Sequence, residues 1–356
     1  MSLKNSLNDP QHKFHRRIIV GFLNTLYKNL PKKELPESIN SIIIIAQEKL
    51  GDAILLLPFL KALNDRFPGI AIDLCCTSYN RKIFEGISFI RNCVSYRPYN
   101  LRFSKLIRSE QYDVLYNPKS GPSSTFHHIT NKVNANVKVC LNDSYNNPIY
   151  NVHLPNDNKK HIAEKYCELL NNYGLSSPIE NWLPKYFYEF PSTINDGEYV
   201  ALNMSAGHQS RKYPYEKWKT IISHILQNSN MKVALFCSKK ETKDAQKLKT
   251  IFKEKIHYPL NSPDLYHASG IINESVLLIS LDTSLIHLAA ALQKPIIGLY
   301  SNDILNYTRY KPYNVLSKNV KSSSEHIRDI DPKNVIENFD QIINNITKAS
   351  TWRSHM

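Results

Sequence analysis

The stretch LISLDTSLIHLAAALQKPIIGLY, residues 278–300, places polar side chains between two apolar runs. VLLIS (276–280) is rich in strand formers, SLIHLAAAL (284–292) has the composition of a helix, and PIIGLY (295–300) is apolar again. This pattern predicts a βαβ unit. Where the first strand of such a unit ends and its helix begins, polar residues lie beside backbone N–H groups that have no acceptor within the helix. These N–H groups attract anions, above all phosphate.

The same pattern recurs towards the N-terminus. SIIIIAQ (41–47), AIDLCC (71–76) and YDVLYN (112–117) predict strands of a first parallel sheet. Between the first two, apolar residues at helical spacing predict a helix that ends before Pro68, and Pro58 predicts either a kink or a helix start near it. A second helix is expected over 161–175.

A second series follows with strands at 199–204 and 232–238 and helices at 215–226 and 239–255. The helix KKETKDAQKLKTIFKEK (239–255) is expected to present a solvated face. The Asn-rich stretch 142–160 is expected to be a surface loop. Two α/β halves result, and ligands of such sheets bind at the carboxyl ends of the strands, so we expect a cleft between the halves.

The 356 residues, 42% of them hydrophobic, suffice for two domain cores. We predict an α/β protein with four parts. These are a basic N-terminal segment and linker (1–38), a Rossmann-like domain (39–185), a second Rossmann-like domain (186–335), and a C-terminal helix and tail (336–356).

The net charge of +14 indicates an acidic partner, which could be nucleic acid, an anionic membrane face or a phosphorylated substrate. Because no nucleic-acid-binding signature accompanies the charge, we do not expect nucleic acid as a partner. Six cysteines without CxxC spacing indicate reduced thiols and the cytoplasm. No apolar run approaches the roughly 20 residues of a membrane span.

One local concentration of charge is HKFHRRIIVGFLNTLYKNLPKKELP, residues 12–36. No small-residue cleavage site follows it, so it does not predict a secretory signal. Two interpretations stay open: an ordinary first helix that packs on the body, or a basic amphipathic segment that rests on anionic lipid.

Three stretches follow predicted strands: EKLGDAILLLP (48–58), NMSAGHQSRKYP (203–214) and SLDTSLIHLAAA (280–291). Three further stretches belong with them: YDVLYNPKSG, HIAEKYCELLNNYGL and IRDIDPKNVIENF. In their order along the chain, the six stretches resemble those of the glycosyltransferases of the lipopolysaccharide heptosyltransferase type. The resemblance covers roughly residues 41–345. It implies the two-domain GT-B fold and inverting transfer of a heptose from ADP-heptose to the inner core of lipopolysaccharide.

Asp52 follows a strand and sits beside Gly51 where a helix begins. Such an Asp is usually a helix N-cap. A carboxylate in reach of an acceptor hydroxyl could instead act as a general base, and the resemblance implies this role for the Asp of the Gly-Asp pair.

Arg211 and Lys212 follow a strand through the small-residue loop that begins at Ser205. They could be solvated surface cations, or they could hold a diphosphate, since a guanidinium binds phosphate through two parallel hydrogen bonds. Cationic contact would stabilise the departing nucleoside diphosphate. The resembling family usually has Lys where Arg211 falls.

In the opening stretch, Thr283 and Ser284 would offer N–H groups and hydroxyls to a diphosphate, and His287 would face the same site one turn later. Asp282 could accept hydrogen bonds from a ribose or order the loop. The alternative is a capped, buried helix with a satisfied histidine. Most relatives have Gly at the position of Ser284, and some have Gly and an acidic residue near Lys239.

We expect no metal and no cofactor, because basic residues and the helix start can meet the phosphate charge. The pair His127 and His128 lacks a further ligand at metal spacing and is expected to lie on the surface. Together these features predict a cytoplasmic, membrane-peripheral glycosyltransferase. Its partners would be a nucleotide-sugar donor, a lipid-linked oligosaccharide acceptor and the anionic inner face of the membrane.

Two alternatives stay open. The same fold could use a UDP- or TDP-linked sugar for outer-core or capsule synthesis. It could also be a divergent member without catalytic activity.

Overall fold

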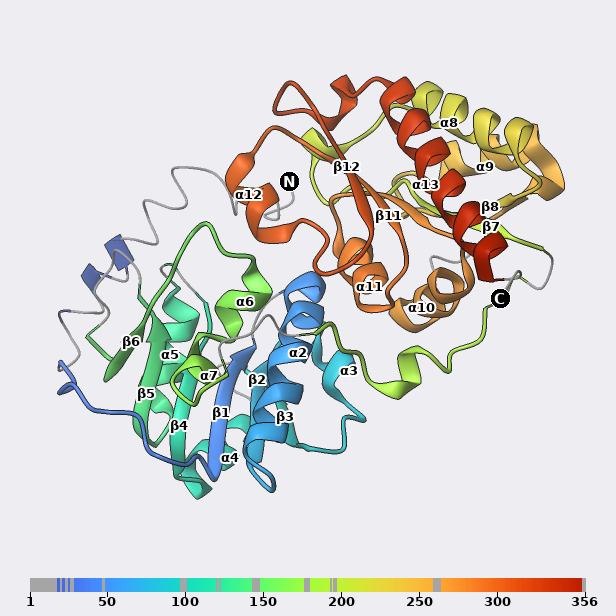
Figure 1. Ribbon diagram of the computed structural model, residues 1–356. Helices are drawn as coiled ribbons and strands as arrows, with labels where there is room; N and C mark the ends of the chain where they lie inside the picture. Colours follow the sequence, from blue (N-terminus) through green and yellow to red (C-terminus); the bar gives the residue numbers. More distant parts are fainter. Residues whose placement is uncertain are drawn as a thin grey trace. The chain divides into compact units, whose positions relative to one another are not determined.

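The computed structural model describes residues 18–19, 21–22, 25, 29–46, 49–96, 101–119, 121, 123–142, 148–175, 180–192, 194, 197–258 and 264–353. The chain divides into two compact units, Met1–Ile179 and Glu180–Met356. Each unit contains one six-stranded parallel sheet with helices packed on it (Figure 1). The predicted α/β class with two Rossmann-like halves is therefore confirmed.

The first sheet has the strand order β3-β2-β1-β4-β5-β6. Its strands are β1 (Ser41–Ala46), β2 (Ala71–Cys76), β3 (Ile90–Ser95), β4 (Tyr112–Asn117), β5 (Ala135–Leu141) and β6 (Val152–Leu154). In the middle of the sheet, the four isoleucines of β1 are at most 1% exposed, which explains its uniformly apolar sequence. After β3 the chain returns to place β4 beside β1, so the topological switch point lies between the carboxyl ends of β1 and β4.

The helices of the first unit are α2 (Leu50–Arg66), α3 (Arg81–Phe84), α4 (Leu101–Ser109), α5 (Ser124–Lys132), α6 (Ile162–Tyr166) and α7 (Glu168–Asn171). α2 begins eight residues before Pro58, so the expectation of a start near that proline is wrong. The single helix predicted over 161–175 is instead two short helices, α6 and α7. Gly174 follows them with φ +82°, a conformation that favours glycine.

The second sheet has the strand order β12-β11-β10-β7-β8-β9. Its strands are β7 (Tyr199–Asn203), β8 (Lys232–Phe236), β9 (Ile256–His257), β10 (Leu278–Leu281), β11 (Ile296–Tyr300) and β12 (Ser317–Lys321). The chain builds β7, β8 and β9 and then returns to place β10 beside β7. The switch point of this unit therefore lies between the carboxyl ends of β7 and β10.

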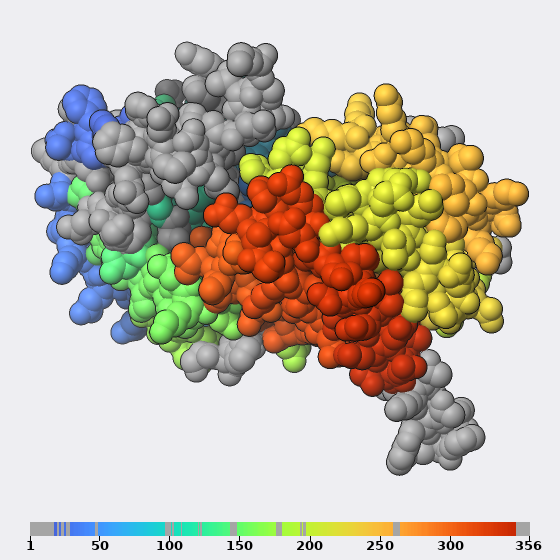
Figure 2. Space-filling model, turned by 90° about the horizontal axis from the view of Figure 1, so that it is seen from above, coloured from blue at the N-terminus to red at the C-terminus, as the bar shows by residue number. Residues whose placement is uncertain are grey.

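The helices of the second unit are α8 (Tyr215–Asn228), α9 (Thr242–Phe252), α10 (Leu265–Glu274), α11 (Ser284–Ala291), α12 (Ile304–Tyr310) and α13 (Pro332–Arg353). The βαβ unit predicted from residues 278–300 is confirmed as β10, α11 and β11. α8 and α13 lie side by side on the face shown in Figure 2, where yellow atoms adjoin red ones. A 2.9 Å contact between His224 Nε2 and Asp340 Oδ1 joins them.

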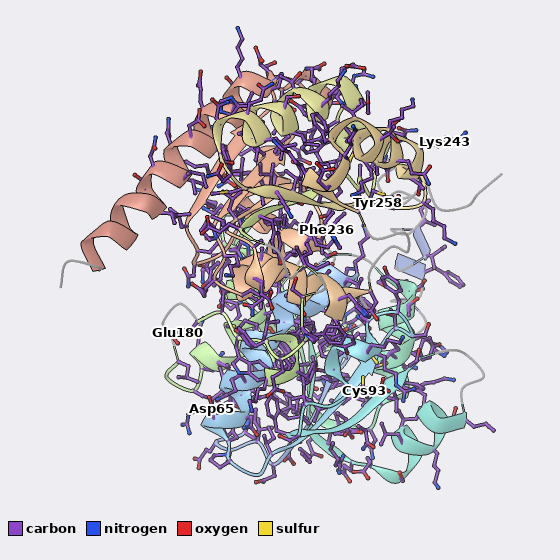
Figure 3. The ribbon with its side chains drawn as sticks, turned by 90° about the vertical axis from the view of Figure 1, so that its right-hand side faces the viewer. Asp65, Cys93, Glu180, Phe236, Lys243 and Tyr258 are labelled. Carbon is purple, nitrogen blue, oxygen red and sulfur yellow. The ribbon has the colours of Figure 1, made fainter. Side chains whose placement is uncertain are left out.

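Surface features of the prediction are partly confirmed. Lys239 and Lys243 are exposed as expected, and Lys243 lies at the outside of the second unit, whereas Phe236 at the end of β8 lies inside it (Figure 3). The prediction of a surface loop over residues 142–160 is wrong in part, because β6 lies within this range and Tyr150 is buried. All six cysteines are within the described residues and are thiols. Among the described helices, none combines the length and apolar character that crossing a bilayer requires.

Candidate active site

In the second unit, the polar residues that follow β7 and β10 meet at the switch point. Asn203, the last residue of β7, is 1% exposed and donates from Nδ2 to Ser280 Oγ and Thr283 Oγ1, both at 3.0 Å. Its Oδ1 accepts a hydrogen bond of 3.0 Å from the backbone N–H of Ser205. One buried amide therefore fixes the loop after β7 against the loop after β10.

Arg211 lies at the end of a 3-10 turn, Gln209–Arg211, and reaches the loop after β10. Its Nη1 lies 3.0 Å from the carbonyl oxygen of Asp282 and 3.1 Å from Asp282 Oδ2. Its Nη2 lies 3.5 Å from Asn306 Oδ1 on α12, and Asn306 Nδ2 donates to Asp282 Oδ2 at 2.8 Å. Arg211, Asp282 and Asn306 thus form one network, in which a neutral amide contacts both members of an ion pair.

Burial makes this network rigid. The Asp282 side chain is only 8% exposed, and that of Arg211 is 30% exposed. A carboxylate with so little access to water needs its cationic partner, because an unpaired buried charge is costly. The open part of the guanidinium is therefore presented to solvent in a fixed orientation. Lys212 follows Arg211 and is half-buried, and the contacts that fix Arg211 do not involve it.

The start of α11 borders this network. Thr283 is the N-cap residue, but its side chain does not cap the helix and accepts from Asn203 instead. Ser284, the first residue of α11, is half-buried. The first N–H groups of a helix lack intrahelical acceptors and attract anions. His287, one turn later, is 5% exposed, and its ring centroid lies 6.1 Å from that of Tyr310.

Tyr300, the last residue of β11, packs close to the network. It is 1% exposed and contacts Tyr307 of α12 edge to face, with 5.2 Å between ring centroids. Burial raises the pKa of Tyr300 well above its ordinary value, and the negative charge of Asp282 raises it further. The hydroxyl therefore stays neutral and adds no second anion beside Asp282.

In the first unit, Gly51 and Asp52 lie in the first turn of α2, directly after the β1 end of the switch point. The N-cap position is occupied by Lys49, so the interpretation of Asp52 as N-cap is wrong. Asp52 is half-buried, and its carboxylate lies in a helix start, where negative charge is favoured.

The histidine pair on α5 differs from the expectation. His127 is 1% exposed rather than on the surface, and burial lowers the pKa of both His127 and His128. Among the residues with described positions, no group of three or more His, Cys, Asp or Glu side chains could hold a metal ion.

Asn203 and Asn306 are site residues that the sequence reasoning missed. Asn203 is the first residue of the NMSAGHQSRKYP stretch, so its place at a strand end was an available signal. Asn306 carries no such signal. It lies 95 residues from Arg211, and only the folded chain brings the two together.

The sequence and the fold of this chain are similar to those of known proteins. The sequence profile of glycosyltransferase family 9 (heptosyltransferase) matches residues 100–339. A protein of Escherichia coli (strain K12) named "Putative lipopolysaccharide heptosyltransferase 4" is 24% identical over 341 residues, covering 88% of this chain and 91% of that protein.

Two solved structures are similar in fold. One is a glycosyl transferase family 9 protein from Veillonella parvula DSM 2008, with a TM-score of 0.71, 16% identity and coverage of 88% of this chain and 99% of that chain. The other is the E. coli heptosyltransferase WaaC with ADP, with a TM-score of 0.71, 18% identity and coverage of 85% of this chain and 99% of that chain.

Proposed function

Because this chain belongs to glycosyltransferase family 9, the heptosyltransferase family, we propose that it transfers a heptose from ADP-heptose to the core of lipopolysaccharide, with inversion at the anomeric carbon. The name of the E. coli relative supports the acceptor class, and the ADP bound to the similar WaaC structure supports the nucleotide.

The observation that carries the proposal is the network of Arg211, Asp282 and Asn306 at the switch point of the second unit. A guanidinium has five N–H donors, and the contacts to Asp282 and Asn306 use at most three of them. At least two donors remain for a diphosphate. Together with the N–H groups at the start of α11, they would bind the diphosphate and stabilise the negative charge that grows on it as it leaves.

Asp52 is the proposed general base. The acceptor hydroxyl oxygen attacks the anomeric carbon as its proton passes to the Asp52 carboxylate, and the bond between that carbon and the diphosphate oxygen breaks. ADP leaves with the bonding electrons. Gly51, beside Asp52 in the first turn of α2, would leave room for the acceptor.

The proposed place of action is the cytoplasmic face of the membrane. The N-terminal segment is basic, and among its described residues Ile18 is 54% exposed and Phe22 is 64% exposed. Exposed apolar side chains on a basic segment favour adsorption to anionic lipid. Sedimentation with anionic vesicles should carry the protein down, and Phe22→Ser should reduce the bound fraction. Equal binding to zwitterionic vesicles would show that electrostatic attraction to anionic lipid does not contribute to membrane binding.

Titration calorimetry and turnover test the enzymatic proposal. ADP should bind more tightly than UDP or TDP, and a clear preference for UDP would remove ADP-heptose as the donor. Asp52→Asn should bind ADP as the wild type does but should not transfer heptose to heptose-deficient lipopolysaccharide. If this variant keeps near-normal rates, Asp52 is not the base.

A further inference from the structure

A small pocket lies at the switch point of the first unit, next to Asp52. Its walls come from the end of β1, the first turns of α2, the loop after β4, and α6. The lining is apolar except for three side chains, Asp52, Lys119 and Tyr166. Its volume of about 10 Å³ is enough for one water-sized group, such as a single hydroxyl.

Tyr166 reaches Asp52 from a helix that is itself held firmly. Its hydroxyl donates to Asp52 Oδ1 at 3.3 Å, and its side chain is 4% exposed. At the start of α6, His161 Nδ1 accepts from the backbone N–H of Ala163, and the Glu164 carboxylate accepts from the N–H of His161. This capping box fixes the helix that carries Tyr166.

The contact between Tyr166 and Asp52 is long for an O–H···O hydrogen bond. Hydrogen bonds at active sites are often long before substrate binds and shorten in the substrate complex. A donated hydrogen bond to one carboxylate oxygen limits rotation of the carboxyl group about its Cβ–Cγ bond.

Lys119 supplies the cation of the pocket. Its backbone N–H donates to Asn117 Oδ1 at 3.2 Å, and Asn117, which is 5% exposed, donates from Nδ2 to Tyr150 Oη at 2.8 Å. Its Nζ lies 5.0 Å from the ring centroid of Phe126. The loop after β4 is thus anchored to the core, and Lys119 lines the same pocket as Asp52.

We propose that Tyr166 is the positioning residue of this site: it orients the Asp52 carboxylate towards a pocket that admits only the attacking hydroxyl of the acceptor sugar, with Lys119 as the cation of that pocket. This inference rests on the proposed function and deepens it. The ligand it assigns to the pocket is a single hydroxyl group of a pyranose acceptor, whose ring stays outside.

Tyr166→Phe tests the inference, because it removes the hydroxyl and keeps the ring. We expect kcat to fall by about tenfold, the loss expected for one charge-assisted hydrogen bond, while KM for ADP-heptose stays unchanged.

Tyr173→Phe is the matched control. The Tyr173 hydroxyl donates to the carbonyl of Pro36 at 2.8 Å in the same unit and does not line the pocket. The control should keep the wild-type kcat. Lys119→Met gives a second test if Tyr166→Phe folds poorly: it should also lower kcat while KM for ADP-heptose stays unchanged.

The inference is overturned if Tyr166→Phe folds and keeps the wild-type kcat while Asp52→Asn is inactive; the proposed function would then stand. It is also overturned if Tyr166→Phe loses thermal stability and activity together while KM for ADP-heptose changes, or if Tyr166→Phe does not fold and Lys119→Met leaves kcat unchanged. An active Asp52→Asn variant would instead contradict the proposed base.

Discussion

Arg211→Met is the substitution that most directly tests the network of the second unit. Methionine is similar in length but has no charge and no N–H donors. The variant leaves the Asp282 carboxylate, 8% exposed, with Asn306 as its remaining partner in the network. The loss should therefore appear both in the stability of the unit and in the affinity for the donor diphosphate.

The size of the stability effect follows from the exposure of the pair. Removing one partner of a fully buried ion pair costs about 3–5 kcal/mol. Because the Arg211 side chain is 30% exposed, water screens the pair, and we expect a loss of about 2 kcal/mol. For a unit of this size such a loss lowers Tm by about 4–8 °C. Loss of charge-assisted hydrogen bonds to phosphate should weaken ADP binding by about tenfold to a hundredfold.

Differential scanning calorimetry and titration with ADP measure the two effects. Arg211→Lys is the control, because it keeps the charge but cannot reach Asp282 and Asn306 with two separate nitrogens. It should show smaller losses than Arg211→Met in both measurements. An Arg211→Met variant with unchanged Tm and unchanged ADP affinity would show that Arg211 neither stabilises the unit nor binds the diphosphate.

Three further predictions concern the second unit. Asn306→Ala should weaken ADP binding by about threefold to tenfold, which is less than Arg211→Met, because it removes the amide that orients both charges but keeps the ion pair. If the amide has no such role, titration calorimetry will give the wild-type affinity for ADP. Gly270→Ala should lower the free energy of unfolding, measured with urea, by about 1–3 kcal/mol, because a Cβ would lie 2.5 Å from the backbone oxygen of Phe190. Gly207→Ala is the control: a Cβ there would have no atom within 4 Å, so this variant should be close to neutral. Burial raises the pKa of Tyr199 to about 12, so its contribution to stability is complete below about pH 10 and is lost as the pH rises through 12. The free energy of unfolding in urea should fall less between pH 8 and pH 11 for Tyr199→Phe than for the wild type. An equal fall in both proteins would show that ionisation of Tyr199 does not cause the loss.

Most central strands of the two sheets could be predicted from sequence, whereas the edge strands and the interior strand β5 could not. β1 and β10 are buried on both faces, so their sequences are continuous apolar runs. The edges of the two sheets are β3, β6, β9 and β12, and none of them was predicted. β12, SKNVK, has one buried residue among five, and β6 has three residues within an Asn-rich stretch. Their pairing depends on a neighbouring strand rather than on their own composition.

The candidate site likewise contains residues that could be predicted from sequence and residues that could not. Arg211 and Asp282 could be singled out because they follow apolar strands, and the structure brings them into contact. Asn306 could not, because an amide side chain in a helix has many possible partners and its role depends on tertiary placement. The N-cap interpretation of Asp52 was wrong because α2 begins two residues earlier, at Leu50, where sequence patterns locate helix ends poorly.

The most direct test of the proposed heptose transfer is an assay with the purified protein, ADP-heptose and heptose-deficient lipopolysaccharide, read by mass spectrometry of the acceptor and by release of ADP. We expect an acceptor heavier by one heptose residue, one ADP released for each transfer, and neither product with Asp52→Asn. An unmodified acceptor with ADP-heptose, together with turnover of a UDP- or TDP-linked sugar, would rule out ADP-heptose as the donor.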